Sequence, residues 1–267
     1  MLGKLLKYEI KGTARMMFPL YAALLVLTII NKIFLSINSQ ATGFVMSMGI
    51  SMTLYICIIV GIMVLTMVVI IQRFYKNLMT DEGYLMFTLP VPVWQHILAK
   101  LLIAMMWCIV AGIVFCLSIF ILAVTGDFFS LVGQFFRDFQ ALEFGVPFTQ
   151  VILCGVEIIG VTLLAMATGI LQIYASIAVG QLFGTHKILG SFGAYIVIDI
   201  ILQIAGTIMM SSFAMSGAMN NLEVFDAMDV FPMFQLLMGV GTLINVALGA
   251  AFFFGTKYLL KNKLNLE

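Results

Sequence analysis

The sequence predicts an all-α membrane protein with six transmembrane helices, and three observations support this fold class. First, 63% of the 267 residues are hydrophobic and only 9% are charged, whereas about 25% of the residues of a soluble domain are charged. Second, the apolar residues gather in six runs long enough to cross a hydrocarbon core of about 30 Å. Third, the positive charges are strongly sorted between alternate connections. A net charge of +1 without a sustained basic stretch also excludes a nucleic-acid-binding protein.

Polar or charged breaks separate the first three predicted spans. The first span, residues 17–37, ends at the polar segment 38–43, and the second, residues 44–71, ends before Gln72 and Arg73. The third, residues 101–126, carries no charge. Each run is long enough to form a helix that crosses the bilayer at about 1.5 Å per residue.

The last three predicted spans are also apolar runs separated by polar or charged segments. The fourth covers residues 148–183, and only the short segment 184–187 separates it from the fifth, residues 188–210. The sixth, residues 231–256, leaves a short basic tail. Six spans leave little room for a soluble domain, so the sequence predicts a single transmembrane domain, 1–267.

The first sixteen residues have the pattern of an amphipathic helix. Their four cations lie at helical spacing on one face, with apolar residues opposite, as in a helix lying on the inner membrane surface. The alternative is that these charges only set the topology of the first span. The cations are Lys4, Lys7, Lys11 and Arg15, and the apolar residues are Leu2, Leu5, Leu6 and Ile10.

The distribution of Lys and Arg predicts that both termini are cytoplasmic. Positive residues close to spans are retained on the cytoplasmic side, and with both ends inside, 11 of the 13 Lys and Arg lie there. Only Lys32 and Arg137 lie outside. The chain is therefore expected to be a multi-pass membrane protein.

The predicted cytoplasmic loop 72–100 carries the most functional information. It exposes apolar side chains between acids at one end and prolines at the other, which is typical of a docking element. The acids also favour the start of a short helix. The alternative is a loop that lies back on the membrane interface. The residues concerned are Asp81, Glu82, Gly83, Tyr84, Leu85, Phe87, Pro90 and Pro92.

This loop and the overall layout resemble the membrane subunits of type-2 ABC exporters. The resemblance rests on an acid-Glu-Gly start, the segment Thr88–Pro92, and a Trp-x-x-Ile-Leu run that ends at a lysine before the third span, with Trp94, Ile97, Leu98 and Lys100. In that family the corresponding stretch forms a coupling helix that sits in a groove of the cytoplasmic ATPase. Here the segment between the last two spans is shorter than the re-entrant helical pair that many members carry.

The resemblance implies a transport role shared among several chains. The sequence has no phosphate-binding loop of the Gly-x-x-x-x-Gly-Lys type, so we do not expect the chain to hydrolyse ATP itself, and we expect neither an enzymatic activity nor a cofactor of its own. ATP and Mg²⁺ would belong to a separate ABC ATPase subunit. A second membrane subunit, identical or related, would complete the permease in the lipid bilayer, and the expected location is a bacterial cytoplasmic (inner) membrane. The expected substrates are drugs, lipid-like molecules or antimicrobial peptides, which suit a chain with 20 Met and 23 Phe.

Polar residues inside the predicted spans are candidates for a transport pathway. Glu157 and Gln172 share a stripe of the fourth span, and Asp199 and Gln203 lie one turn apart in the fifth. Ionised groups at this depth are costly, so they should face protein or water. They serve either the pathway or structural hydrogen bonds between helices. No catalytic group and no metal site is expected, because the cysteines and histidines lack ligand spacing.

Two other functions compete with the exporter. An ATP-independent channel or carrier, or a membrane scaffold of a regulatory complex, would have the same composition but would purify without an ATPase. An intramembrane enzyme would need clustered catalytic groups at one depth, and no predicted span holds a histidine.

Overall fold

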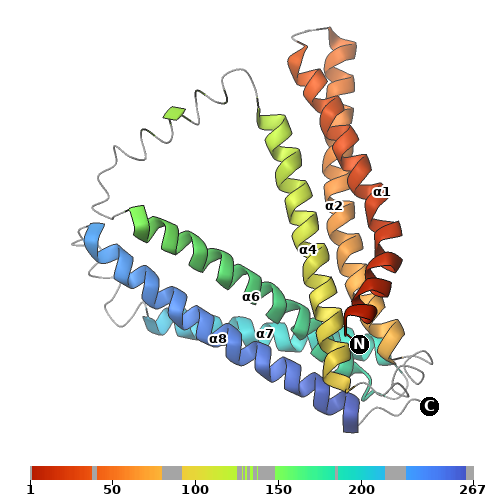
Figure 1. Cartoon of the computed structure of the whole chain (residues 1–267), viewed down its shortest axis with the longest axis vertical. Coiled ribbons are helices and arrows are strands. Elements are labelled where there is room, and N and C mark those ends of the chain that lie inside the picture. Colours follow the sequence, from red (N-terminus) through yellow and green to blue (C-terminus); the bar gives the residue numbers. More distant parts are fainter. Residues whose placement is uncertain are drawn as a thin grey trace. The chain divides into compact units, whose positions relative to one another are not determined.

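A computed structural model covers the whole chain and describes residues 2–37, 41–79, 92–124, 148–183, 186–213 and 227–262, together with residues 128, 130, 133, 134 and 137. These ranges contain helices and no strand. The long helices are α1 (Leu2–Ser36), α2 (Thr42–Met79), α4 (Val93–Ala123), α6 (Phe148–Gly180), α7 (Lys187–Phe213) and α8 (Ala227–Asn262) (Figure 1).

Within the described ranges, six helices are long and apolar enough to cross a membrane, as many as the predicted spans, and the all-helical fold class is confirmed there. Their ends differ from the predicted ends. Helix α2 continues to Met79 and α4 already begins at Val93, so both ends of the predicted loop 72–100 are helical. At about 1.5 Å per residue, helices of 38 and 31 residues are longer than the hydrocarbon core is thick.

Helix α1 is continuous from Leu2 to Ser36. The predicted helix 1–16 therefore continues directly into the first span, without a break at Met16 or Met17. Lys7, Lys11 and Arg15 are exposed, whereas Glu9 and Thr13 are buried. One face of this segment is thus part of the protein interior, and its placement on the membrane surface stays a prediction.

The chain forms two compact units. The first contains α1 together with most of α2 and α4, and its core draws on all three helices. Tyr55 of α2 and Ser118 of α4 share a buried hydrogen bond of 2.8 Å between their hydroxyl groups. The buried apolar residues of this core are Met17, Tyr21, Leu24, Tyr55, Ile62, Val69, Ile103 and Trp107.

Lys32, one of the two cations predicted to lie outside, caps a helix in this first unit. Its ammonium group donates to the carbonyl oxygens of Leu122, at 3.2 Å, and Val124. The last carbonyl groups of a helix lack intrahelical partners and carry a partial negative charge. Lys32 therefore satisfies the end of α4, which gives this isolated cation a structural role.

The second unit contains α6, α7 and α8, with α6 packed against both of the others (Figure 1). The Thr168 hydroxyl lies 3.2 Å from the Asn245 carbonyl oxygen of α8. At the other contact, Gly180 of α6 lies directly against Ser191 of α7. The end of α2 also belongs to this unit, where Phe74 stacks on Tyr174 with ring centroids 4.0 Å apart. The single transmembrane domain, 1–267, stays a prediction.

Candidate functional site

Most residues of the predicted docking element lie outside the described residues. These are Asp81, Glu82, Gly83, Tyr84, Leu85, Phe87 and Pro90. Pro92 is described and exposed, and its carbonyl oxygen accepts a hydrogen bond of 2.9 Å from the Gln95 amide at the start of α4. Trp94, in the first turn of that helix, is 40% exposed. The evidence for a functional site therefore comes from the two helical ends of the loop.

Both ends of the loop are joined to one buried carboxylate of α1. Glu9 Oε2 lies 3.1 Å from Arg73 Nη1, in the last third of α2, and Glu9 Oε1 lies 3.1 Å from Lys100 Nζ, in the first third of α4. The Lys100 side chain is 6% exposed and the Glu9 side chain 9%, whereas Arg73 is 35% exposed. We call Glu9, Arg73 and Lys100 the ion triad.

The ion triad connects three helices, α1, α2 and α4, through the two oxygens of one carboxylate. Hydrogen bonds between ionised groups are shorter and stronger than neutral ones, and the two oxygens of one carboxylate can serve two cations. Gly12 makes room for this arrangement, because a Cβ at that position would lie 2.6 Å from Arg73 Nη2. A displacement of the loop end of α2 or α4 must therefore move α1 as well, or break an ion pair.

A hydrogen bond next to the ion triad ties α1 to α4 a second time. The Trp107 indole Nε1–H donates to the Thr13 hydroxyl oxygen at 2.8 Å, and the Thr13 hydroxyl in turn donates to the Glu9 carbonyl oxygen at 2.9 Å. Thr13 is 2% exposed and Trp107 4%. Thr13 lies one turn after Glu9, so the two residues present a single polar face of α1 to its neighbours.

We expect Thr13→Val to lower the stability of the protein by about 1–2 kcal/mol, because the buried indole N–H of Trp107 loses its acceptor. The measurement is thermal unfolding of the detergent-solubilised protein. The matched control is Thr53→Val on α2, which removes the same kind of backbone hydrogen bond, to Gly49, from an exposed residue. Equal unfolding temperatures for the two variants would contradict the expected result.

Sequence reasoning missed Glu9, although a signal for it exists. Glu9 is the only Asp or Glu before Asp81, and it stands among the cations of the N-terminal segment. Isolated acids of this kind need a positive partner when they are buried. Its partners Arg73 and Lys100 are both among the cations predicted to be cytoplasmic, but only the fold shows that they meet at Glu9.

The candidate pathway residues fall into two separate pairs in the second unit. Glu157 Oε1 accepts a hydrogen bond of 3.3 Å from Gln235 Nε2 of α8, and Asp199 Oδ2 accepts one of 2.7 Å from Gln203 Nε2 within α7. Among the described residues, no hydrogen bond joins the two pairs. Gln235 is a further polar residue of this region that sequence reasoning did not single out.

Some buried polar atoms of α6 lack a hydrogen-bond partner among the described residues. Within the described residues, Glu157 Oε2 and Gln172 Nε2 are buried without a hydrogen bond. Thr168, on the same stripe, contacts the backbone of α8. Both Glu157 and Thr168 thus bind a neighbouring helix, which favours the structural interpretation of this stripe, whereas the hydrogen bond between the side chains of Asp199 and Gln203 stays within α7.

Comparisons of the chain with protein-family models, with curated proteins and with solved structures found no match. The resemblance to type-2 ABC exporters therefore stays a prediction from the residues of the loop and the order of the spans. In the part of the chain that the structure describes, no group of three or more His, Cys, Asp or Glu residues could hold a metal ion.

Proposed function

We propose that the chain is the membrane subunit of an ATP-driven ABC exporter in a bacterial cytoplasmic membrane. It would work with a separate ABC ATPase and with a second membrane subunit. The observation that carries the proposal is the ion triad, because one buried carboxylate of α1 holds both helical ends of the predicted docking element. A loop that served only as a connection would not need this attachment.

The ion triad supplies a physical route from the loop to the spans. Closure of an ATPase dimer would push on the docking element near Leu85 and Phe87, and α2 and α4 would carry the displacement along their axes. Glu9 makes α1 follow, since the alternative is to separate ionised groups that are largely buried. Three helices of the first unit would then move together, as alternating access requires.

An apolar or amphipathic substrate fits the residues of the spans best. The described helices carry many methionines and phenylalanines, whose side chains adapt to varied apolar surfaces. Charged residues within the spans are few, and Asp199 with Gln203 forms the polar pair with the greater exposure. We assign substrate contact to this pair before Glu157 and Gln172.

The docking role predicts that Phe87→Asp abolishes association with the ATPase. A carboxylate placed in an apolar groove loses its hydration without gaining a partner, so recovery of the ATPase should fall at least tenfold, a change of about 1.4 kcal/mol or more. The measurement is the amount of ABC ATPase that co-purifies with the tagged chain from its native membrane. Leu85→Asp should have the same effect.

Phe87→Leu is the matched control, because it changes the same position and keeps it apolar. It should retain the ATPase, and all variants should insert into the membrane in equal amounts. Equal recovery of the ATPase with Phe87→Asp would refute the docking role. Purification of the unaltered chain without any ATPase, with transport that survives ATP depletion, would instead identify an ATP-independent channel or carrier.

A further inference from the structure

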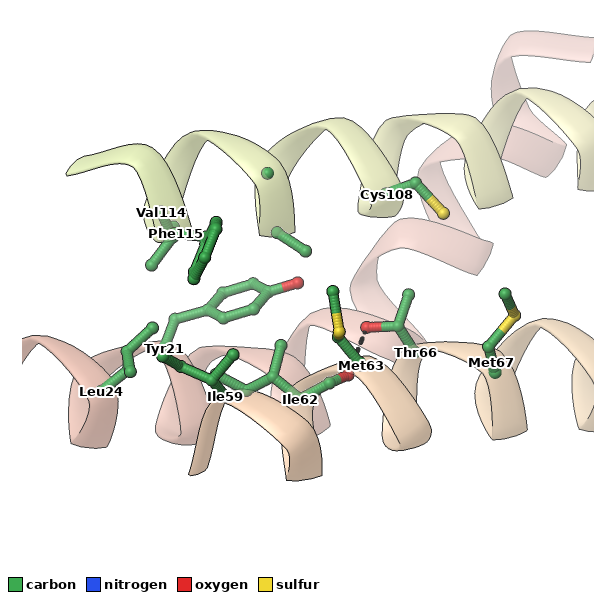
Figure 2. Close-up of a pocket in the computed structure, with 12 residues that line it drawn as sticks. Tyr21, Leu24, Ile59, Ile62, Met63, Thr66, Met67, Cys108, Val114 and Phe115 are labelled. Carbon is green, nitrogen blue, oxygen red and sulfur yellow. Dashed lines mark hydrogen bonds between the residues drawn. The ribbon is translucent and has the colours of Figure 1, made fainter. Parts of the chain in front are cut away.

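Two parts of the predicted spans differ in the charge that they offer to a ligand. Figure 2 shows a pocket of the first unit, with side chains of α1, α2 and α4 around it. Its lining includes no charged residue, so charge cannot select an occupant there. Helix α7 of the second unit instead carries a carboxylate, Asp199, within a predicted span.

Asp199 lies in the middle of α7 with one carboxylate oxygen unpaired. The residue is about 18 Å from Lys187 along the helix axis, at about 1.5 Å per residue. Its side chain is half-buried. Oδ2 accepts a hydrogen bond of 2.7 Å from Gln203 Nε2, whereas Oδ1 has no hydrogen-bond partner among the described residues. An ionised group at this depth is costly unless it faces water or protein or meets an opposite charge.

The chain itself supplies no counter-ion at the level of Asp199. Lys32 is the only Lys, Arg or His within the six predicted spans, and its ammonium group donates to carbonyl oxygens at the end of α4. No salt bridge between described residues includes Asp199. A second copy of this chain would have the same sequence and would bring no further cation to this depth. A positive partner for the carboxylate therefore has to come from another kind of molecule.

Aromatic side chains lie next to Asp199 on the same side of α7. Tyr195 precedes it by four residues and Phe192 by seven, so the three residues share one face of the helix. Tyr195 is 38% exposed and Phe192 is 65% exposed. An aromatic ring attracts a cation that lies over its face within about 6 Å, and more strongly away from water. An anionic oxygen beside exposed rings is thus suited to a cation with an apolar body.

We propose that the cation face of α7, defined as Phe192, Tyr195, Asp199 and Gln203, binds an apolar cation with a single positive charge. Asp199 Oδ1 contacts the charged group, Gln203 holds the other carboxylate oxygen, and the two rings cover the apolar body. One carboxylate neutralises one positive charge, so a monovalent cation leaves no net charge within the span. This inference rests on the proposed exporter, because it assigns lipophilic cations as the substrate class.

Tetraphenylphosphonium and tetraphenylborate test the role of charge, because the two ions have the same shape and opposite signs. The measurement is the dissociation constant of each ion from the full-length chain in a nonionic detergent, by equilibrium dialysis without ATP. Asp199→Asn keeps the shape of the side chain and removes its charge. It should raise the dissociation constant of tetraphenylphosphonium at least about tenfold. The same variant should not weaken the binding of tetraphenylborate.

Asp199→Glu is the matched control, because it keeps the negative charge at the same position. It should change the dissociation constant of tetraphenylphosphonium by less than about threefold. Equal dissociation constants of this cation for Asp199→Asn and Asp199→Glu would overturn the proposal. An equal loss of affinity for tetraphenylborate in Asp199→Asn would also overturn it, since the variant would then have damaged an apolar surface without charge selection.

Tyr195→Leu tests the contribution of the aromatic ring. It should raise the dissociation constant of tetraphenylphosphonium by about threefold, because a leucine offers no ring face to the cation. Tyr195→Phe keeps the ring and should bind this cation as the unaltered chain does. Equal dissociation constants for the two variants would refute the contact between the cation and the ring.

The proposed exporter and the cation face can fail separately. Co-purification of an ABC ATPase with a chain that shows no Asp199-dependent binding of tetraphenylphosphonium would support the exporter and refute the cation face. Asp199-dependent binding by a chain that brings down no ATPase would support the cation face and identify an ATP-independent carrier of cations.

Discussion

Glu9→Gln is expected to lower the free energy of unfolding of the solubilised protein by about 3 kcal/mol, the lower end of the range for a broken buried ion pair. The substitution keeps the shape of the side chain but removes the negative charge that Arg73 and Lys100 both contact at 3.1 Å. Lys100 contributes most of the loss because its side chain is only 6% exposed, whereas water already screens part of the Arg73 interaction. Thermal unfolding in detergent measures the effect.

Two further variants separate the ion triad from general charge effects. Lys11→Gln removes a charge from an exposed position of the same helix and should change the stability by less than about 0.5 kcal/mol. Glu9→Leu combined with Lys100→Met removes both buried charges, and it should recover part of the loss, because apolar pairs often replace buried ion pairs without cost. An unfolding temperature of Glu9→Gln equal to that of Lys11→Gln would disprove a stabilising ion triad.

The number and approximate position of the spans could be predicted because they depend on local composition. Each of the six apolar runs became a helix that can cross a membrane. Helices α2 and α4 extend beyond the predicted spans, since residues 72–79 and 93–100 contain charges that end a hydrophobic run but do not end a helix. Hydropathy reports the extent of the bilayer, whereas helix length follows from backbone hydrogen bonding and packing.

The ion triad could not be predicted because its members are far apart in the sequence. Glu9, Arg73 and Lys100 come from three helices, and their contact depends on how those helices pack. The contact of Lys32 could not be predicted for the same reason, because only packing brings it close to the C-terminal carbonyl groups of α4. Asp199 and Gln203 are the opposite case, because their hydrogen bond joins residues one turn apart and follows from helical spacing.

Gly180→Ala is expected to destabilise the second unit by at least about 2 kcal/mol, because the contact of α6 with α7 leaves no room for a side chain. A Cβ at position 180 would lie 2.5 Å from the Cα of Ser191 and would also overlap its amide nitrogen and hydroxyl. These are largely backbone atoms, so a rotamer change cannot relieve the overlap. Only a shift of α7 can do so, and such a shift weakens the packing between the two helices. The measurement is again thermal unfolding in detergent.

Gly169→Ala is the matched control for this prediction, because it makes the same substitution in the same helix. A Cβ at position 169 meets no atom within 4 Å, so the variant should gain about 0.5–1 kcal/mol from the higher helix propensity of alanine. The two variants should therefore change the unfolding temperature in opposite directions. If both raise it, Gly180 is not required for close packing of α6 against α7. In that case α6 and α7 would have to lie farther apart than the direct contact of Gly180 with Ser191 indicates.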